Sequence, residues 1–455
     1  MASKQDKLIV GLDVGTTKCC AIIGEVTRDS HINILGFGSS PTTGLQKGVV
    51  VNIDQASASI SAAIEMAERQ AGLKVDKVFV GVTGSHVSSV NSRGVVAVAK
   101  SNRDITYEDV GRALDSARSV SIPSQREVLH VIPRTYVIDG QDGVRDPVGM
   151  SGYRLEVETH IVTGAISALN NLFKAVQRTG VEVDELVLQP LAASEAVLSD
   201  AEKRLGVCLI DIGAGTTDIA IYIDGSIWHT AVLPVGGNHI TNDLSIVLRT
   251  SPGAAEQLKV KHGDASVTGP YKGLYADYYG KGPLKHDFRS RLKAEAEGTG
   301  EETAEGEEHP DQMLEAESLE PGKPHLVSRN LLNEVIHARV RQLFDMVQAE
   351  IKKSGYDGMI PAGLVVTGGT STLQGITDAA GHVLRMPVRI GVPRGLSGLA
   401  DSLGGPAYAS SVGLMLWGLN KRNNAEQLLE ANRRGGKNSM AVGRKFGGWL
   451  REFLP

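Results

Sequence analysis

The chain has 455 residues and a formal net charge of −5, so it is long enough for two or more domains and carries no overall basic field that favours a nucleic-acid partner. Only three cysteines occur, and Cys19 and Cys20 are adjacent, which excludes a disulfide framework and favours a reducing cytosol. No apolar stretch reaches the roughly 20 residues of a membrane-spanning helix.

The core of a first lobe is predicted over residues 7–83. Apolar runs over residues 8–37 predict a meander of three short strands, and the loop between the first two is rich in glycine and threonine. Asp54 is the predicted N-cap of a helix that ends at about Ala71, and a buried strand follows over residues 78–82.

A small α+β subdomain is predicted as an insertion over residues 84–161. Strand-like alternations there surround one helix, residues 107–119, and do not extend the first sheet. The first lobe core then continues over residues 162–205, where a strand at 186–188 runs into a helix opened by Gln189.

The second lobe, predicted over residues 206–360, repeats the plan of the first. Three strands between residues 207 and 233 form another meander, again with a Gly/Thr-rich loop in the first turn. A segment of about 265–325 interrupts this lobe. Its residues 293–320 carry eleven acidic side chains against one lysine, and this composition predicts a disordered surface loop.

After this acidic loop the pattern predicts a long amphipathic helix over residues 331–353 and a strand over 364–367. The strand opens a final part of the second lobe, residues 361–419, which ends in a predicted helix at about 403–414. Because a meander followed by a helix occurs twice, the chain is predicted to be an internal duplication.

The two Gly/Thr loops, residues 11–18 and 211–218, carry the strongest functional signal. Glycine permits positive φ and close backbone approach, so successive N–H groups and threonine hydroxyls can converge on an anion. Aspartates beside an anion require a divalent cation, and Asp13 and Asp211 are predicted to hold Mg²⁺ through water, because Mg²⁺ dehydrates reluctantly. The loops therefore predict a nucleotide clamp that is not a Walker P-loop; the alternative is two hairpins with small-residue turns. The predicted phosphate ligands and their neighbours are Gly11, Gly15, Thr16, Thr17, Gly213, Gly215, Thr216, Thr217 and Asp218, and for Asp218 a turn-stabilising role is equally open.

With these loops the chain resembles the actin/Hsp70/sugar-kinase ATPase superfamily, five of whose motifs occur in order. They are the two phosphate loops, a first connecting helix at 189–196, an adenosine loop at 367–370 and a second connecting helix at about 403–414. Within the superfamily the chain is similar to the FtsA family of bacterial cell-division proteins, over essentially all of residues 7–419 plus the C-terminal tip. The similar stretches include residues 149–156, 160–164, 236–241 and 259–263.

The resemblance implies an α/β, actin-like two-lobed ATPase fold with duplicated ribonuclease-H-like subdomains, in which the insertion 84–161 replaces the usual outer subdomain. It also implies ATP or ADP with Mg²⁺, self-association into filaments, and at most slow ATPase activity. Such proteins bind the C-terminal tail of the tubulin-like protein FtsZ and tether the division ring to the cytoplasmic side of the inner membrane at the septum. Other divisome proteins are expected to bind the insertion.

The resemblance also assigns individual roles. Lys18 is expected to offset phosphate charge, and Gln189 to orient the attacking water, the alternative being a polar helix start before Pro190. The FtsZ tail is expected near the 331–353 helix with Arg339 as a participant, the alternative being a solvated helix face. The residues matched to positions around the nucleotide are Gly236, Gly237, Asn238, Glu256, Lys259, Gly368 and Gly369.

The C-terminal tip, residues 443–455, follows a predicted polar linker over 420–442. Its large apolar residues fall at i, i+3, i+4, i+7 and i+8, which predicts one continuous helical face flanked by cations. This pattern favours an interfacial anchor on anionic membrane lipids over a terminal helix that docks on its own core. The apolar residues are Phe446, Trp449, Leu450, Phe453 and Leu454, and the cations are Arg444, Lys445 and Arg451.

Two other functions on the same fold stay open from the sequence. A small-molecule, sugar-type kinase shares the look of the first loop, but it needs an acidic residue aimed at a substrate hydroxyl and a polar sugar pocket, and the sequence identifies neither. An actin-like pilus-assembly ATPase is the second alternative, and it should lack the amphipathic tip.

Overall fold

The computed structural model describes residues 7–27, 29, 31–98, 104–119, 121–266, 312–316, 325–398 and 402–434, the last eleven as backbone alone. The chain divides into a larger unit, Met1–His239, Leu343–Thr372 and Leu384–Pro455, and a smaller unit, Ile240–Gln342 and Leu373–Val383. None of the described helices combines the length and apolar character that a membrane crossing requires.

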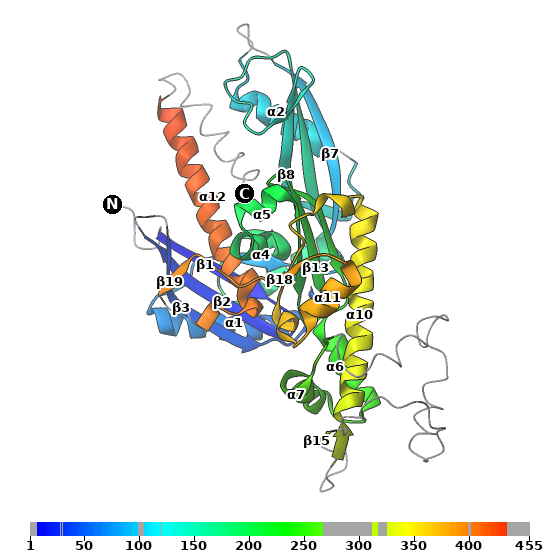
Figure 1. Ribbon diagram of the computed structural model, residues 1–455. Helices are drawn as coiled ribbons and strands as arrows, with labels where there is room; N and C mark the ends of the chain where they lie inside the picture. The colour runs from blue at the N-terminus through cyan, green and yellow to red at the C-terminus, as the bar shows by residue number, and fades with distance from the viewer. Residues whose placement is uncertain are drawn as a thin grey trace. The chain divides into compact units, whose positions relative to one another are not determined.

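A six-stranded sheet forms the first half of the larger unit, in the order β11-β6-β1-β2-β3-β19 (Figure 1). Strands β1, β2 and β3 are the predicted meander, paired antiparallel, and β6 and β11 extend the sheet in parallel on the other side of β1. The bounds are β1 Leu8–Val14, β2 Lys18–Val26, β3 Ile32–Pro41, β6 Lys77–Val82, β11 Glu182–Leu188 and β19 Leu396–Gly398, and a separate hairpin pairs β4 Leu45–Gln46 with β5 Val49–Val50.

Helix α1, Ile53–Ala71, covers β2 and β3 and packs against α3, Ile166–Gln177. Its buried face includes Ala56, Ile60, Ala63 and Ala67, and its N-cap differs from the predicted one. Asn52 caps the helix by accepting a hydrogen bond from the Gln55 amide, and Asp54 lies in the first turn, where a carboxylate is favoured by the helix dipole.

A five-stranded sheet in the order β14-β13-β12-β17-β18 repeats the plan of the first. Strands β12, β13 and β14 are antiparallel neighbours, and β17 joins β12 in parallel as β6 joins β1. The register places Asp13 opposite Cys20 and Asp211 opposite Asp218, so the two Gly/Thr loops occupy equivalent turns. The bounds are β12 Val207–Ile212, β13 Thr217–Ile223, β14 Ser226–Leu233, β17 Leu364–Thr367 and β18 Val388–Ile390.

The insertion between β6 and β11 folds around its own sheet, in the order β7-β10-β8-β9, with α2 packed on β7 and β10. It has a separate apolar core that includes Leu114, Leu155 and Val157. The bounds are β7 Ser88–Ala97, α2 Tyr107–Arg118, β8 Arg126–Ile138, β9 Gln141–Val144 and β10 Arg154–Ala165.

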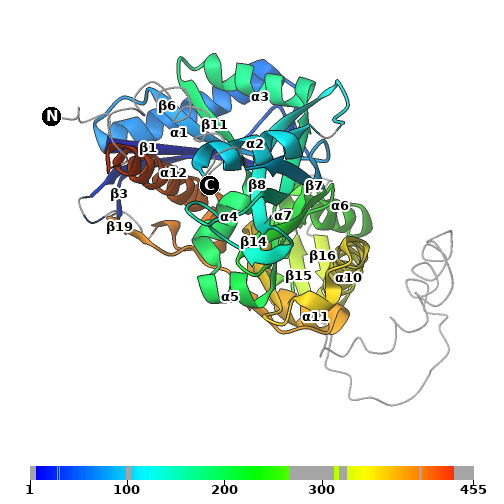
Figure 2. The ribbon, with the colours of Figure 1, turned by 90° about the horizontal axis from the view of Figure 1, so that it is seen from above.

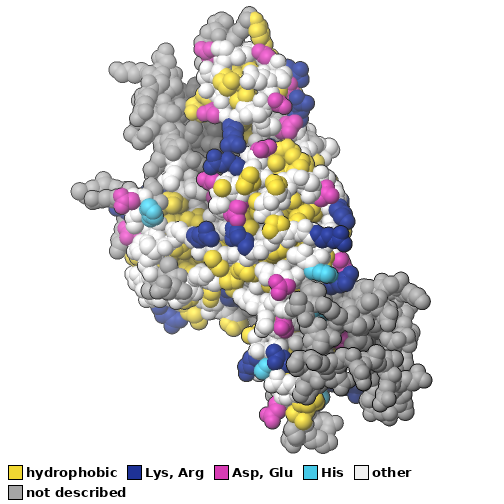
Figure 3. All heavy atoms as spheres, viewed as in Figure 1, with side chains coloured by type: hydrophobic (Ala, Val, Ile, Leu, Met, Phe, Trp, Pro, Cys, Tyr) yellow, Lys and Arg dark blue, Asp and Glu magenta, His cyan; other side chains and the backbone are white. Residues whose placement is uncertain are grey.

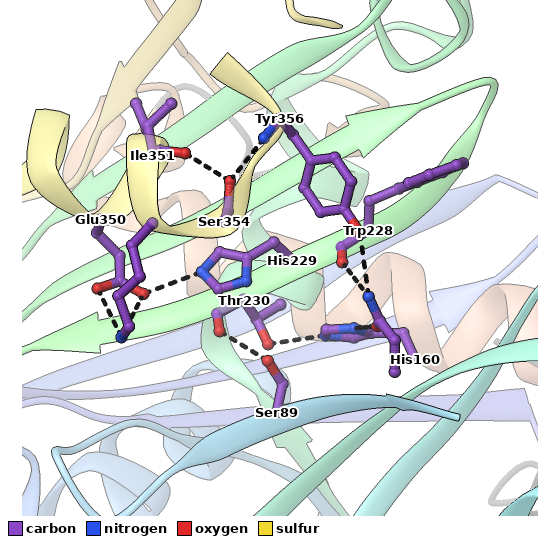
Figure 4. A network of polar contacts seen from close by, with 11 residues as sticks. Ser89, His160, Trp228, His229, Thr230, Glu350, Ile351, Ser354 and Tyr356 are labelled. Carbon is purple, nitrogen blue, oxygen red and sulfur yellow. Dashed lines mark hydrogen bonds and ion pairs between the residues drawn. The ribbon is translucent and has the colours of Figure 1, made fainter. Parts of the chain in front are cut away.

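Polar contacts attach this insertion to β14 (Figure 4). His160 Nε2 lies 3.0 Å from Thr230 Oγ1, and Ser89 donates a hydrogen bond of 2.9 Å to the Thr230 carbonyl. The Asn91 amide donates to the carbonyl of Trp228 at 3.2 Å. The insertion is therefore attached to β14. This strand pairs with β13, which directly follows the second Gly/Thr loop.

Two helices cross beside the first sheet: α4, Gln189–Val197, and α12, Ala409–Arg434 (Figure 2). The short helix α5, Asp200–Leu205, follows α4. At the crossing the backbones approach so closely that a Cβ on Gly413 would lie 1.9 Å from the Ala192 carbonyl oxygen. Only glycine fits that position without displacing one helix.

Helix α12 differs from the prediction at both ends. It begins at Ala409, after the 3₁₀ turn η6, Pro406–Tyr408, because the Gly405-Pro406 pair disfavours an earlier helical start. It continues through Arg434, so the first part of the predicted linker 420–442 is helical. No glycine or proline occurs between Gly418 and Gly435 to end it.

The smaller unit contains most of α6 and α11, all of α7, the first part of α10 and a hairpin of β15 and β16. The sequence predicts a disordered loop here, but residues 313–316 of that loop form strand β15, which pairs with β16. The loop residues 267–311 and 317–324 lie outside the described residues. The bounds are α6 Gly237–Val247, α7 Pro252–His262, β15 Met313–Ala316, β16 His325–Ser328, α10 Arg329–Ser354 and α11 Ile376–Leu384, and the 3₁₀ turns η3 Asp357–Met359 and η4 Gly369–Thr372 belong to the larger unit.

The face of the molecule in Figure 3 carries charges of both signs. Lys and Arg side chains lie interspersed with Asp and Glu over its described residues, with apolar atoms between them. Mixed signs of this kind give a weak net field, in keeping with the formal charge of −5.

The α4–α12 crossing makes a testable prediction. An alanine in an exposed helix position is more stable than glycine by about 1 kcal/mol, yet Gly413→Ala should destabilise the protein by about 1–3 kcal/mol, because its methyl group overlaps the Ala192 carbonyl. Urea denaturation measures the difference. Gly405→Ala is the control, since its Cβ meets nothing within 4 Å, and equal stability of the two variants would show that the crossing is not tight.

Candidate functional site

The two Gly/Thr loops have the same local structure and lie against each other. Each is closed by one backbone hydrogen bond, from Gly15 N to the Lys18 carbonyl at 3.0 Å and from Gly213 N to the Thr216 carbonyl at 2.9 Å. A Cβ on Gly215 would lie 2.6 Å from Thr16 Oγ1, so the tip of the second loop needs glycine where it meets the first. The duplication predicted from the sequence therefore brings the two loops together.

Asp13 and Asp211 lie near the ends of β1 and β12, and both are buried, with 8% and 7% of their surface exposed. Asp13 Oδ1 accepts a hydrogen bond of 2.7 Å from the Gln189 side-chain amide, and its Oδ2 accepts one of 3.0 Å from the Ser411 hydroxyl. Asp211 Oδ2 accepts from the Ser410 hydroxyl at 2.7 Å. Four elements, β1, β12, α4 and α12, thus meet at two carboxylates.

The electrostatics of the carboxylates follow from this burial. Burial raises the pKa of Asp13, against the opposing effect of the Lys18 charge. Burial raises the pKa of Asp211 to about 6, although the Ser410 hydrogen bond acts in the other direction. Two buried carboxylates with raised pKa values favour a bound cation, because positive charge offsets the cost of ionising them away from water.

Asp218 is the third buried carboxylate of the site. Its Oδ1 accepts a hydrogen bond of 2.6 Å from Thr83 Oγ1, at the end of β6, and its Oδ2 accepts one of 3.3 Å from Thr216 Oγ1. Burial, followed by the nearby Asp211 charge, raises the pKa of Asp218 to about 8. The side chain thus joins the start of β13 to the first sheet, which fits the turn-stabilising alternative as a structural role.

Lys18 and Thr217 are held by backbone carbonyls. The Lys18 ammonium donates to the Ala407 carbonyl at 3.0 Å and lies 3.6 Å from the centre of the Tyr408 ring. The Thr217 hydroxyl donates to the Val235 carbonyl at 2.8 Å. For these two side chains a role toward phosphate stays a prediction.

The other predicted glycines of the larger unit surround the second loop. The amides of Gly237 and Asn238 donate to the carbonyls of Gly213 and Ala214 at 3.0 and 2.8 Å, and a Cβ on Gly236 would lie 2.5 Å from the Gly213 oxygen. Gly368, with φ +88°, would place a Cβ 2.3 Å from Asp211 Oδ1, so the loop predicted to contact adenosine lies against this carboxylate. Its neighbour Gly369 opens the 3₁₀ turn η4.

Three predicted residues belong to the smaller unit. Lys259 of α7 is buried and donates to Glu256 Oε2 at 2.6 Å and to the Thr241 hydroxyl at 2.9 Å. Arg339 of α10 forms an ion pair with Asp243, with hydrogen bonds of 2.5 and 2.9 Å from Nε and Nη2.

The predicted membrane residues, 444–454, lie outside the described residues.

The donor set fits a hydrated Mg²⁺ better than a directly ligated metal. Among the described residues, no group of three or more His, Cys, Asp or Glu side chains is arranged to hold a metal ion. Two buried carboxylates beside two loops would hold the ion through its water ligands, because Mg²⁺ usually keeps several waters.

Sequence reasoning missed Ser410, Ser411 and Thr83, all of which donate to the site carboxylates. The only signal for Ser410 and Ser411 was their place inside the predicted second connecting helix, and Thr83 lies in none of the five predicted motifs. A serine pair at that place was not enough to single them out, since nothing in the sequence shows which carboxylates it faces.

Two models of known families match the chain. The model described as "SHS2 domain inserted in FTSA" matches residues 84–163, and the model described as "Cell division protein FtsA" matches residues 208–274 and 290–413. Relatives named "Cell division protein FtsA" extend this match. That of Pseudomonas aeruginosa is 43% identical over 93% of this chain and 92% of its own, and that of Escherichia coli (strain K12) is 34% identical over 98% of each chain.

Solved structures share the fold at low identity. The "PilM-PilN type IV pilus biogenesis complex" has a TM-score of 0.59 at 14% identity, covering 90% of this chain and 98% of that chain. MreB 5 of Spiroplasma citri bound to AMPPNP has a TM-score of 0.52 at 14% identity, covering 92% and 98%. Duplicated sheets, paired loops and crossing helices thus define an actin-like ATPase fold with an inserted SHS2 domain. The chain belongs to the FtsA family of cell division proteins, which confirms the resemblance inferred from the sequence.

The buried Asp218 makes a pH-dependent prediction. Its pKa of about 8 lies above that of an unfolded aspartate, so between about pH 4 and pH 8 the folded protein holds a proton that the unfolded chain releases. The free energy of unfolding should therefore fall as pH rises through this window, by up to about 1.4 kcal/mol per pH unit. Asp218→Asn should remove that slope.

Urea denaturation at pH 6, 7 and 8, in EDTA and without nucleotide, measures the slope for each protein. Asp224→Asn is the control, since Asp224 is exposed in the turn between β13 and β14. Parallel pH profiles for the wild type and Asp218→Asn would mean that the Asp218 carboxyl is ionised in the folded protein.

Proposed function

We propose that the chain is a nucleotide-dependent, filament-forming adaptor that attaches FtsZ to the cytoplasmic face of the bacterial inner membrane at the division septum. The observation that carries the proposal is the meeting of two equivalent Gly/Thr loops, each preceded by a buried aspartate, in a member of the FtsA family. Different parts of the chain support the proposed binding of nucleotide, membrane and FtsZ.

ATP or ADP is the proposed ligand of the paired loops. Glycines at both tips would permit close approach of phosphate to the loop backbone, because they carry no side chain. A solved structure of the same fold, MreB 5 of Spiroplasma citri, is bound to AMPPNP. Glu256 and Lys259, which pair with each other in α7, stay predicted contacts of adenosine.

Asp13 and Asp211 are the residues that would hold Mg²⁺ through water. When bound, the ion would offset phosphate charge and draw phosphate oxygens toward the two carboxylates. The hydrogen bond to Asp13 fixes the orientation of the Gln189 amide, which supports its proposed role of positioning a water. Since no strong general base is assigned, hydrolysis should be slow.

The C-terminal tip is the proposed membrane anchor. Its five apolar side chains would face the acyl region, and each of its three cations would add about 1 kcal/mol near an anionic leaflet. One copy should bind reversibly, whereas a filament that displays many copies binds by avidity. Self-association would thus couple nucleotide binding to membrane residence.

FtsZ binds, in this proposal, through its C-terminal tail near the 331–353 helix. Arg339 is the proposed participant, and its ion pair with Asp243 would have to rearrange if the guanidinium binds the tail. Other divisome proteins are proposed to bind the insertion, whose sheet and helix form a separate core.

The nucleotide proposal predicts the effect of removing both aspartates. Asp13→Ala with Asp211→Ala should weaken the binding of ATP in Mg²⁺ by at least about tenfold, because the two carboxylates no longer hold the hydrated ion. Isothermal titration calorimetry measures the affinity. The control is Asp224→Ala in the exposed β13–β14 turn. Undiminished ATP affinity in the double variant would refute the proposed nucleotide site.

The adaptor proposal predicts that FtsZ floats with anionic vesicles only when this chain is present. Trp449→Asp should abolish flotation of both proteins, because a charge replaces the central ring of the apolar face. Trp449→Phe keeps that face and is the matched control. If the Trp449→Asp and Trp449→Phe variants bind vesicles equally well, the proposed membrane anchor is refuted. If the chain binds vesicles but FtsZ does not float with it, the proposed adaptor role is refuted.

A further inference from the structure

Two consecutive serines at the start of α12 contact the two aspartates of the loops. Ser410 donates to Asp211 Oδ2 at 2.7 Å, and Ser411 donates to Asp13 Oδ2 at 3.0 Å. Both serines are buried, with 7% and 0% of their surface exposed. Successive side chains of a helix point about 100° apart, so one turn of α12 reaches both halves of the duplicated fold.

The remaining oxygens of the carboxylates are also constrained. Asp13 Oδ1 accepts from Gln189 at the start of α4, so both of its oxygens are held. Asp211 Oδ1 lies where a Cβ of Gly368 would approach to 2.3 Å, so the backbone of the adenosine loop limits its rotation. The serine hydroxyls therefore decide how each carboxylate faces the loops.

A serine near the start of a helix often bonds with its own helix, which makes a purely local role the natural alternative. Here both hydroxyls reach out of α12 to acidic groups that are distant in sequence. Hydrogen bonds to charged groups are stronger than neutral ones, and they favour the ionised carboxylate. An ionised, oriented carboxylate is what a hydrated divalent cation requires.

We propose that Ser410 and Ser411 are positioning residues, which hold the carboxylates of Asp211 and Asp13 in place for the hydrated Mg²⁺ that accompanies a bound nucleotide. This inference rests on the proposed function of the paired loops. It adds a separate role for each element: each lobe supplies one aspartate, and a single helix, α12, orients both.

The test separates binding that depends on Mg²⁺ from binding that does not. A fluorescent ATP analogue is titrated into the full chain, first with EDTA and then with increasing Mg²⁺, for Ser410→Ala, Ser411→Ala and the double variant. Each single variant should raise the Mg²⁺ concentration at half-effect by on the order of tenfold, as expected for a lost hydrogen bond to a charged group. Affinity in EDTA should change less than about twofold.

Ser92→Ala is the control, because Ser92 is half-buried and its hydroxyl donates to the Ala117 carbonyl at 2.8 Å within the inserted subdomain, away from the loops. Ser410→Thr retains the hydroxyl and should keep the wild-type Mg²⁺ dependence. Urea denaturation of every variant checks that the fold is intact, and if an alanine variant does not fold, Ser410→Thr is compared with Ser410→Val, which has the same shape without the hydroxyl.

Two outcomes overturn the inference: an unchanged Mg²⁺ dependence in the double variant, or equal losses of affinity with and without Mg²⁺, which would indicate a structural role. A wild-type chain that binds no nucleotide under any condition would instead refute the proposed function itself. The two failures are therefore distinguishable.

Discussion

The structure depends on the burial of two like charges beside each other. Asp13 and Asp211 end equivalent strands, and the side chains that hold them, Gln189, Ser410 and Ser411, are all neutral. Burying acidic groups is costly even with the Lys18 charge nearby, and the raised pKa values of both aspartates express that cost. A protein that keeps such an arrangement has a use for the negative charge, and a cation with its anionic ligand is the simplest one.

Four elements of the larger unit, β1, β12, α4 and α12, meet at this pair. The two meanders bring the aspartates to equivalent turns, and α4 and α12, which cross at Gly413 and Ala192, supply the hydrogen-bond donors. The insertion lies farther along the same path of contacts. Its His160 and Ser89 bond with Thr230 of β14, and β14 pairs with β13, which directly follows the second loop.

The sequence predicted the parts whose signal is local. Repeated strand and loop patterns located both meanders. Glycine is required at 236 and 368, where a Cβ would lie 2.5 Å from the Gly213 oxygen and 2.3 Å from Asp211 Oδ1, and at 215, where it would lie 2.6 Å from Thr16 Oγ1. The sequence did not predict contacts between segments that are far apart in the chain. Asn52 replaced Asp54 as the N-cap of α1, which depends on one turn of backbone geometry. The hydroxyls of Ser410, Ser411 and Thr83 acquire their partners only when strands and helices far apart in sequence are packed together.

Helix α12 has a mechanical consequence. It has 26 residues, Ala409–Arg434, and at 1.5 Å per residue it extends about 39 Å. One end lies on the carboxylates and the other end leads to the C-terminal tip, so the helix is a lever whose short arm is at the loops. A tilt of about 5° at Ser410 and Ser411 would move the far end by roughly 3 Å, which follows from that length. A small displacement at the two carboxylates would therefore be larger at Arg434, the far end of α12.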